Sequence, residues 1–254
     1  MLRDHRRALA YSAALLVATA VLFAIVGANP RHPVIQPLDD RWYAAMNDLR
    51  SPAATFLAKV LDLLGGVYVT LPIRIGVAVW LIARRRWRAF ATWVLTWALS
   101  EITVTMVKVW FDRPRPPGQL VPTSGSSFPS GHATAVAATA VALVLVLFPE
   151  GSTRRKWEAA AIAVTFFMSL SRTYLNAHWF SDVLAGSLLG AGIAILSAGI
   201  STEVRDILVR REARKAPRDP PAEPGVAAAD PTPEAPGEAN DHRRAPGITP
   251  TAPG

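Results

Sequence analysis

The sequence predicts an all-α protein that crosses a membrane six times. Hydrophobic residues make up 51% of the 254 residues and charged residues only 18%, and the charges gather in short blocks between long apolar runs. This segregation is typical of polytopic membrane proteins, whose spanning helices each need about 20 apolar residues. Cysteine is absent, which excludes a disulfide framework, a thiolate nucleophile and a cysteine-based metal site.

The first predicted span covers residues 8–28. Arg3, Arg6 and Arg7 precede it, and a basic start before an apolar run also describes a signal peptide. The run is longer than the core of a usual signal peptide, and further spans follow it. We therefore expect this first helix to be retained.

Residues 29–65 have a mixed pattern. Prolines near the start of this region oppose an immediate helix. Between Leu38 and Leu64, apolar residues recur every three or four positions with charged residues between them. This spacing predicts amphipathic helix at the membrane surface or against the bundle, rather than a span.

The remaining five predicted spans are 66–83, 90–109, 133–148, 157–170 and 183–200. Basic clusters come before the first span, between the second and third, between the fourth and fifth, and after the sixth. Six crossings put all of these clusters on one side, so the positive-inside rule predicts a plasma-membrane protein with both termini in the cytoplasm. The polar loops 108–132 and 171–182 then share the extracytoplasmic face.

The chain divides into three predicted parts. Residues 1–65 hold the first span and an extracytoplasmic amphipathic segment, 66–202 form the core, and 203–254 form a basic anchor with a cytoplasmic tail. The tail from residue 216 onward is rich in proline, alanine, glycine and acidic residues, a composition that predicts disorder. Because the net charge of +8 reflects basic clusters beside apolar runs, we expect the membrane, and not nucleic acid, as the partner.

The second polar loop places Arg172, His178 and Asp182 at the membrane edge, where an unpaired charge is costly. If this stretch is helical, His178 and Asp182 lie one turn apart on one face, and the carboxylate can accept the proton of one ring nitrogen. The other nitrogen is then a better base or nucleophile. Arg172 offers a planar set of donors that suits phosphate oxygens. The alternative is a capping network in an interfacial loop.

Ser130, Gly131 and His132 directly precede an apolar helical run. Ser130 is placed to cap this helix, whose first amide groups point outward without partners. Free N–H groups at the positive end of a helix bind anions, and Gly131 lets a phosphate oxygen approach the backbone. An ordinary capped helix beside a surface histidine is the alternative.

Lys108 and Arg115 flank the segment that leaves the third predicted span. Two cations in one loop can neutralise the oxygens of a phosphoryl group in its transition state. The alternative is snorkelling of long side chains to the membrane interface. For Arg113, in the same run, we expect snorkelling or loop packing.

Two charges, Arg74 and Glu101, lie inside predicted spans. Their heights above the cytoplasmic turn near Arg86 differ by roughly 4 to 5 Å, a gap that an arginine side chain can close. We therefore predict a buried Arg74–Glu101 pair between neighbouring helices. The rival is a pair between Glu101 and Lys108 on the same helix.

The three polar clusters together resemble the three-part signature of the type 2 phosphatidic acid phosphatase (PAP2) superfamily, without a missing position. The matching positions are Lys108-x6-Arg115-Pro116, Pro129-Ser130-Gly131-His132 and Ser171-Arg172-x5-His178-x3-Asp182. The likeness covers about residues 66–200. It implies a PAP2-type helical bundle and a phosphatase that uses no metal or other cofactor and forms a phosphohistidine.

The resemblance also implies a role for each matching position. His178 is the expected nucleophile, oriented by Asp182, and His132 is the expected general acid and then general base. The phosphoryl oxygens are expected to be held by Lys108, Arg115, Ser130, Gly131 and Arg172. The expected substrate is an anionic phospholipid or a polyprenyl phosphate or pyrophosphate at the outer membrane face.

Three other functions share parts of this pattern. A phosphotransferase would use a second lipid or a glycan in place of water. Vanadium-dependent haloperoxidases hold vanadate in a similar constellation, but they resemble soluble proteins, which the six predicted spans oppose. A non-enzymatic protein that binds or transports anionic lipid needs only the cations and the helix end, and the two histidines with a carboxylate argue against it.

Overall fold

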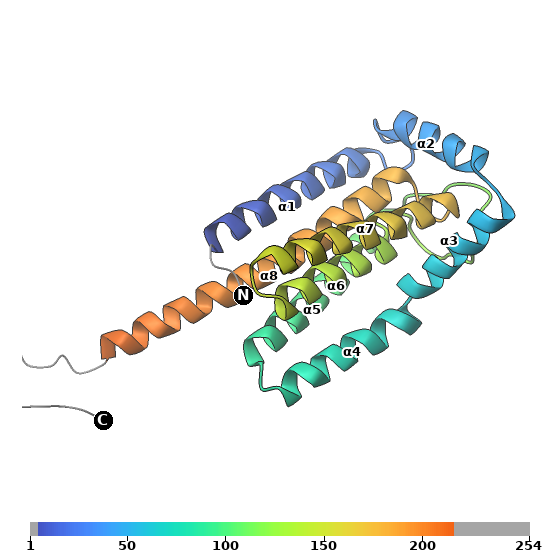
Figure 1. The fold of residues 1–254 in the computed structure, drawn as a ribbon. Coiled ribbons are helices and arrows are strands. Elements are labelled where there is room, and N and C mark those ends of the chain that lie inside the picture. Colours follow the sequence, from blue (N-terminus) through green and yellow to red (C-terminus); the bar gives the residue numbers. More distant parts are fainter. Residues whose placement is uncertain (1–4, 216–254) are drawn as a thin grey trace, which may run out of the picture. The chain divides into compact units, whose positions relative to one another are not determined.

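The computed structural model of this chain describes residues 5–215, and within them it contains eight α-helices and no β-strand (Figure 1). The all-helical prediction is confirmed for this part of the chain. The tail that was predicted to be disordered, residues 216–254, lies outside the described residues. The helices are α1 (His5–Ala28), α2 (Gln36–Asp48), α3 (Pro52–Gly65), α4 (Val67–Ala83), α5 (Trp87–Trp110), α6 (Gly131–Leu147), α7 (Ser152–Tyr174) and α8 (Phe180–Lys215).

Each predicted span falls on a helix, in chain order α1, α4, α5, α6, α7 and α8. Three segments, Arg6–Ala28, Trp87–Trp110 and Phe180–Val209, are long and apolar enough to cross a membrane. Helices α3 and α4 would add a fourth span, bent by 41°, whereas α6 is apolar but shorter. The chain is thus an all-helical membrane protein, and the count of six crossings stays a prediction.

The region expected to be amphipathic forms two helices, α2 and α3. Pro37 in α2 and Pro52 in α3 occupy first-turn positions, where the missing N–H has no intrahelical partner to lose. Ser51 caps α3 by accepting a hydrogen bond from the amide of Ala54 at 3.2 Å. The helical prediction is therefore confirmed here. α3 packs against α7 and ends at Gly65, where the chain bends into α4.

Helix α8 packs against α1, α5, α6 and α7 and forms the centre of the bundle (Figure 1). It crosses α6 at two glycines. A Cβ atom on Gly186 would lie 2.6 Å from the carbonyl oxygen of Ser130, and one on Gly190 would lie 2.4 Å from that of Thr134. Only glycine permits this approach. The crossing brings the starts of both helices together, where the amide of Ser130 donates to the carbonyl oxygen of Asp182 at 3.1 Å.

The predicted pair of charges inside the bundle is present. Nη1 of Arg74 lies 2.6 Å from Oε1 of Glu101, which joins α4 to α5. Arg74 also donates to Oγ1 of Thr139 at 3.0 Å and to the carbonyl oxygen of Ala135 at 3.3 Å, both on α6. The pairing is confirmed, but the burial is one-sided, because the Arg74 side chain is 6% exposed and that of Glu101 is 51% exposed.

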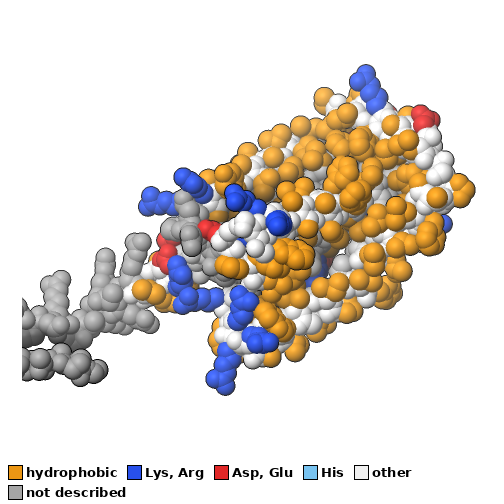
Figure 2. All heavy atoms as spheres, viewed as in Figure 1, with side chains coloured by type: hydrophobic (Ala, Val, Ile, Leu, Met, Phe, Trp, Pro, Cys, Tyr) orange, Lys and Arg blue, Asp and Glu red, His pale blue; other side chains and the backbone are white. Residues whose placement is uncertain are grey.

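The surface fits a bundle embedded in lipid. On the face shown in Figure 2, the side chains along the helices are mostly hydrophobic, while lysine and arginine gather at the end of the bundle where α1 begins. Large apolar side chains are exposed on α1, α4 and α7, among them Val17, Val79 and Phe166. An apolar belt with a basic end is the expected surface of a membrane protein.

Candidate active site

His178 lies in the turn between α7 and α8, outside the helix on which the pairing with Asp182 was conditional, and it is buried. Its ring nitrogen Nδ1 lies 2.7 Å from the carbonyl oxygen of Ser127. Because a carbonyl oxygen can only accept, Nδ1 carries the hydrogen and Nε2 is unprotonated. Nε2 accepts a hydrogen bond from Nη1 of Arg115 at 3.4 Å. The fold therefore presents an unprotonated ring nitrogen beside a cation.

Asp182, in the first turn of α8, lies near His178 but does not accept its proton directly. Its Oδ2 is 3.6 Å from Nδ1 of His178, which is longer than a hydrogen bond. Oδ2 instead accepts from the amide of Trp179 at 2.8 Å and from the hydroxyl of Ser127. The expected direct bond is replaced by the Ser127 carbonyl because residues 175–179 form a turn. Asp182 secures that turn and the serine that holds His178.

The imidazole of His178 is neutral at physiological pH. Burial lowers the pKa of His178 from 6.5 to about 3, and the Asp182 carboxylate opposes this shift only in part. The charges of Arg172 and Arg115 lower the pKa further. A neutral ring keeps its lone pair on Nε2, which a nucleophile requires.

Of the two expectations for Arg113, snorkelling is wrong and loop packing is confirmed, because the side chain is buried in the loop that follows α5. Its guanidinium forms ion pairs with Asp182 at 2.5 Å and with Asp39 at 2.7 Å, and all three side chains are 0% exposed. Asp39, on α2, also accepts from the amide and the hydroxyl of Ser181 at 2.8 and 2.7 Å. Burial raises the pKa of Asp39, although these hydrogen bonds oppose the rise. This network ties α2 to the first turn of α8.

Two predicted phosphate-binding cations approach the same space from different elements. Nη1 of Arg115 donates to the carbonyl oxygen of Ala177 at 2.6 Å, and Nη2 donates to that of Ser124 at 2.8 Å. Lys108 comes from the last turn of α5, and its Nζ lies 3.8 Å from where a Cβ on Gly131 would sit. Within residues 5–215, Lys108 has no hydrogen-bond or ion-pair partner, so its ammonium group is available to an anion.

The start of α6 has the predicted geometry. Ser130 is the capping residue, and its hydroxyl accepts from the amide of Ala133 at 3.4 Å. Gly131 is the first residue of the helix, and His132 follows with a side chain that is 30% exposed. The first amide groups of α6 therefore lie beside Lys108.

Arg172 and His132 both lie next to Asp62, which was expected only to be one of the charges within an amphipathic helix. Asp62 lies in the last turn of α3, and its Oδ1 contacts Nη1 of the buried Arg172. The same oxygen lies 3.5 Å from Nε2 of His132. The carbonyl oxygen of Arg172 accepts from the amide of His178 at 3.3 Å. Through these contacts all eight predicted site residues converge at one end of the bundle.

Four residues of this cluster were not among the predicted site residues: Asp39, Asp62, Arg113 and Ser127. Arg113 offered a signal, since it stands in the same short run as Arg115. Asp62 and Asp39 offered none beyond their charge, because each lies in an amphipathic segment far along the chain from its partners. Ser127 acts largely through its backbone, which no side-chain pattern reveals.

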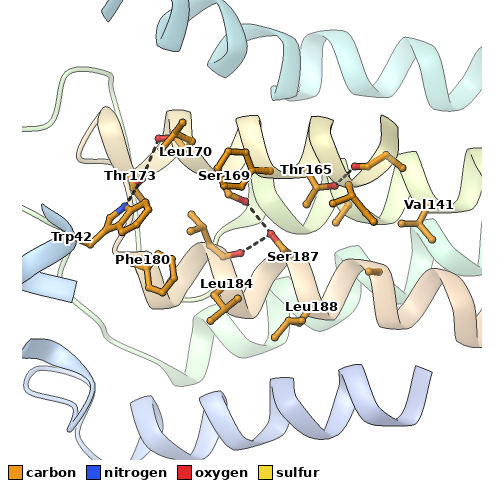
Figure 3. A pocket seen from close by; sticks show the side chains of 16 residues that line it. Trp42, Val141, Thr165, Ser169, Leu170, Thr173, Phe180, Leu184, Ser187 and Leu188 are labelled. Carbon is orange, nitrogen blue, oxygen red and sulfur yellow. Dashed lines mark hydrogen bonds between the residues drawn. The ribbon is translucent and has the colours of Figure 1, made fainter. Parts of the chain in front are cut away.

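A separate apolar cavity of about 340 Å³ lies among α6, α7 and α8 (Figure 3). Trp42 lines it and donates to Oγ1 of Thr173 at 3.0 Å, while the hydroxyls of Ser169 and Ser187 lie 3.0 Å apart in its wall. Thr173 faces this cavity, but its neighbour Arg172 contacts Asp62 of α3. None of the eight predicted site residues lines the cavity, so the cavity is separate from the polar cluster.

A neutral buried histidine, a second histidine and several cations converge at one end of a lipid-embedded helical bundle. This donor set suits a phosphoryl group. The class of protein that such a fold and site define is a membrane-embedded phosphatase.

Comparison with known proteins leads to the same class. A model of the PAP2 superfamily matches residues 89–205. The undecaprenyl-diphosphatase of Sulfolobus acidocaldarius is 32% identical over 155 residues, which are 58% of this chain and 68% of that protein. The lipid A 1-phosphatase of Porphyromonas gingivalis is 37% identical over 105 residues, 41% of this chain but only 22% of that protein.

A solved structure agrees in fold. The crystal structure of a transmembrane PAP2-type phosphatidylglycerolphosphate phosphatase from Bacillus subtilis matches with a TM-score of 0.67 at 25% identity. The match covers 76% of this chain and 96% of that one. The chain belongs to the PAP2 superfamily, and it is a membrane lipid phosphatase.

Proposed function

We propose that this protein removes phosphate from a lipid phosphate or pyrophosphate at the outer face of the plasma membrane, through a phosphohistidine. The observation that carries the proposal is the state of His178, whose Nδ1 donates to the carbonyl oxygen of Ser127 while the unprotonated Nε2 accepts from Arg115 at 3.4 Å. An unprotonated ring nitrogen beside a guanidinium, which can bind a phosphate oxygen, is the arrangement that nucleophilic attack on phosphorus requires.

In the first step, Nε2 of His178 attacks phosphorus, a bond from nitrogen to phosphorus forms, and the bond from phosphorus to the leaving oxygen breaks. His132 gives its proton to that oxygen as general acid. The phosphoryl oxygens are held by Lys108, Arg115, Ser130, Arg172 and the amide of Gly131. Asp182 stabilises the positive charge that the His178 ring acquires.

In the second step, the neutral His132 takes a proton from a water molecule, which attacks the phosphorus of the phosphohistidine. The bond from nitrogen to phosphorus breaks, inorganic phosphate leaves, and His178 returns to its neutral form. No metal enters either step, and the assay described below contains a chelator for this reason.

The substrate class follows from the relatives and the membrane setting. The relatives are named for undecaprenyl diphosphate, lipid A 1-phosphate and phosphatidylglycerolphosphate, which differ in their lipid but share a phosphate ester or anhydride. We therefore assign polyprenyl or glycerol-based lipid phosphates to this chain. The outward-facing site and the cytoplasmic termini rest on the basic clusters between the predicted spans.

The proposed parts of the chain are 1–65, the catalytic core 66–202, and the anchor and tail 203–254. Two contacts extend the first part into the site. Asp39 binds Arg113, and Asp62 binds Arg172, so the N-terminal part contributes to the polar cluster as well as to membrane insertion.

Phosphate release from a panel of isoprenoid and glycerol-based lipid phosphates, in detergent with EDTA, tests the proposal. We expect release from at least one lipid by the wild type and a loss of about a hundredfold or more in His178→Ala. His32→Ala, at an exposed histidine that is not one of the predicted site residues, is the matched control and should keep full activity. An acid-labile phosphoprotein should form in the wild type and not in His178→Ala.

Other results would redirect the assignment. Full turnover by His178→Ala would exclude this nucleophile. Phosphoryl transfer to an added lipid in place of water would make the protein a phosphotransferase. Saturable lipid binding without release from any lipid would favour a binding or transport protein.

A further inference from the structure

One carboxylate lies inside the cluster of cations without a role in the proposed reaction. Oδ1 of Asp62 contacts Nη1 of Arg172 and lies 3.5 Å from Nε2 of His132. The three side chains come from α3, α7 and α6, and they are 23%, 4% and 30% exposed. A carboxylate is an unexpected group at a site for phosphate, because it repels the substrate and competes for the same cation.

The surroundings hold this carboxylate in place. Gly65, one turn along α3 from Asp62, lies so close to the neighbouring helices that a Cβ there would be 3.3 Å from Cδ2 of His132 and 2.3 Å from Cε of Met168. The end of α3 is therefore fitted against both α6 and α7. Oδ1 of Asp62 and Nε of Arg172 are buried and have no hydrogen-bond partner within residues 5–215.

Charged groups from three neighbouring elements lie near His132. Lys108 of α5 and Arg115 of the loop before α6 are cations that act on it, and Asp62 of α3, paired with Arg172 of α7, is the carboxylate that approaches the ring. His132 lies ahead of the predicted span 133–148. Burial, followed by the charges of Lys108 and Arg115, lowers the pKa of His132. A general acid in this environment needs a nearby negative charge to keep its proton.

We infer that Asp62 is a positioning residue of the phosphatase reaction, which holds the imidazole of His132 and the guanidinium of Arg172 together and keeps His132 able to donate a proton. This inference rests on the function proposed above. Asp62 does not touch the substrate in this role. Asp182 of α8 supports His178 through Ser127, whereas Asp62 of α3 approaches the ring of His132 directly, so each histidine has its own carboxylate from a different helix.

A second role for the same carboxylate gives opposite results. If Asp62 occupied the phosphate position as an inhibitory stand-in for substrate, its removal would expose Arg172 to the lipid phosphate. Activity would then rise and KM would fall. The two roles can be separated by a substitution of Asp62 that removes the negative charge and keeps the shape of the side chain.

The experiment compares Asp62→Asn and Asp62→Glu with Asp48→Asn, an exposed aspartate on α2 that serves as the matched control. We expect kcat of Asp62→Asn to fall about tenfold with a small change in KM, because proton donation typically contributes a hundredfold or more. The alkaline limit of the kcat profile should move to lower pH. Asp62→Glu should recover part of kcat, and Asp48→Asn should match the wild type.

A measurement that needs no turnover accompanies the kinetics. In protein with isotope-labelled histidine, the His132 resonance is identified by its loss in His132→Asn, and its titration midpoint is followed by NMR in detergent. The midpoint should fall in Asp62→Asn and stay in place in Asp48→Asn. An unchanged midpoint, an unchanged alkaline limit or a rise in kcat would overturn the inference. If the wild type released no phosphate at all, the proposed function would fail, while the midpoint would still decide the role of Asp62.

Discussion

The carbonyl oxygen of Ser127 determines which nitrogen of His178 is protonated, from a distance of 2.7 Å. The same serine donates its hydroxyl to Asp182. One residue thus links the carboxylate to the histidine, through its side chain on one side and its backbone on the other. The histidine and aspartate of the third motif act together without a direct hydrogen bond.

This linkage predicts unequal effects of two substitutions. Ser127→Ala keeps the carbonyl and loses only the hydroxyl bond, so kcat should fall about tenfold, the value of one hydrogen bond to a charged group. Asp182→Ala removes the acceptor of the Trp179 amide and leaves Arg113 short of a partner, so kcat should fall about a hundredfold or more. The measurement is kcat at saturating lipid for folded variants. Equal losses would contradict the linkage.

Arg113 should be a determinant of stability. Arg113→Met leaves the buried carboxylates of Asp39 and Asp182 without their cation, and breaking a buried pair in this way costs about 3 kcal/mol. The midpoint of thermal unfolding in detergent should fall clearly. The control is Arg31→Gln, which breaks an exposed pair with Asp112 at 3.5 Å and should leave the midpoint nearly unchanged. Similar midpoints for the two variants would refute the prediction.

The crossing of α6 and α8 should not tolerate a side chain. In Gly190→Ala the new Cβ would lie 2.4 Å from the carbonyl oxygen of Thr134, so the helices must separate and activity should fall at least about tenfold. Gly76→Ala is the matched control, because nothing lies within 4 Å of its Cβ position. Phosphate release and the unfolding midpoint of both variants test this. Normal activity in Gly190→Ala would show that the contact is not required.

Stability should fall as the solution becomes acidic. The unfolded chain binds a proton at His178 near its ordinary pKa of 6.5, whereas burial lowers the folded pKa to about 3. Between these values the unfolded state holds more protons, so stability rises with pH and is lost as pH falls. Unfolding midpoints from about pH 7 to about pH 4.5 should fall less steeply in His178→Asn. Parallel curves would show that His178 does not contribute.

Much of the architecture could be predicted from the sequence because long apolar runs indicate helices directly. The runs 8–28 and 183–200 fall within α1 and α8, and the Arg74–Glu101 pair followed from helical rise alone. Ser130 was correctly predicted to cap α6, because a serine directly before an apolar helical run is a typical helix cap.

The rest of the site depends on contacts that local patterns do not contain. The turn that holds His178 is stabilised by the backbone of Ser127, fifty-one positions away in the chain. The ion pairs of Arg113 could not be predicted, because its partner Asp39 lies on α2 and three helices, α3, α4 and α5, separate the two residues in the chain. Asp62 lies in an amphipathic pattern, where a charged residue is expected in any case, so the sequence pointed to no partner for it.

The close crossing of α6 and α8 has a consequence for how the chain is connected. Gly186 and Gly190 let α8 pack directly against the backbone of α6. The distance between the reacting groups is therefore set by the packing of these two helices, and not by the link between α6 and α7. We therefore expect that link to tolerate lengthening or a cut. Two separately synthesised pieces, one ending after α6 and one starting at α7, would find each other in the bilayer and rebuild a working enzyme.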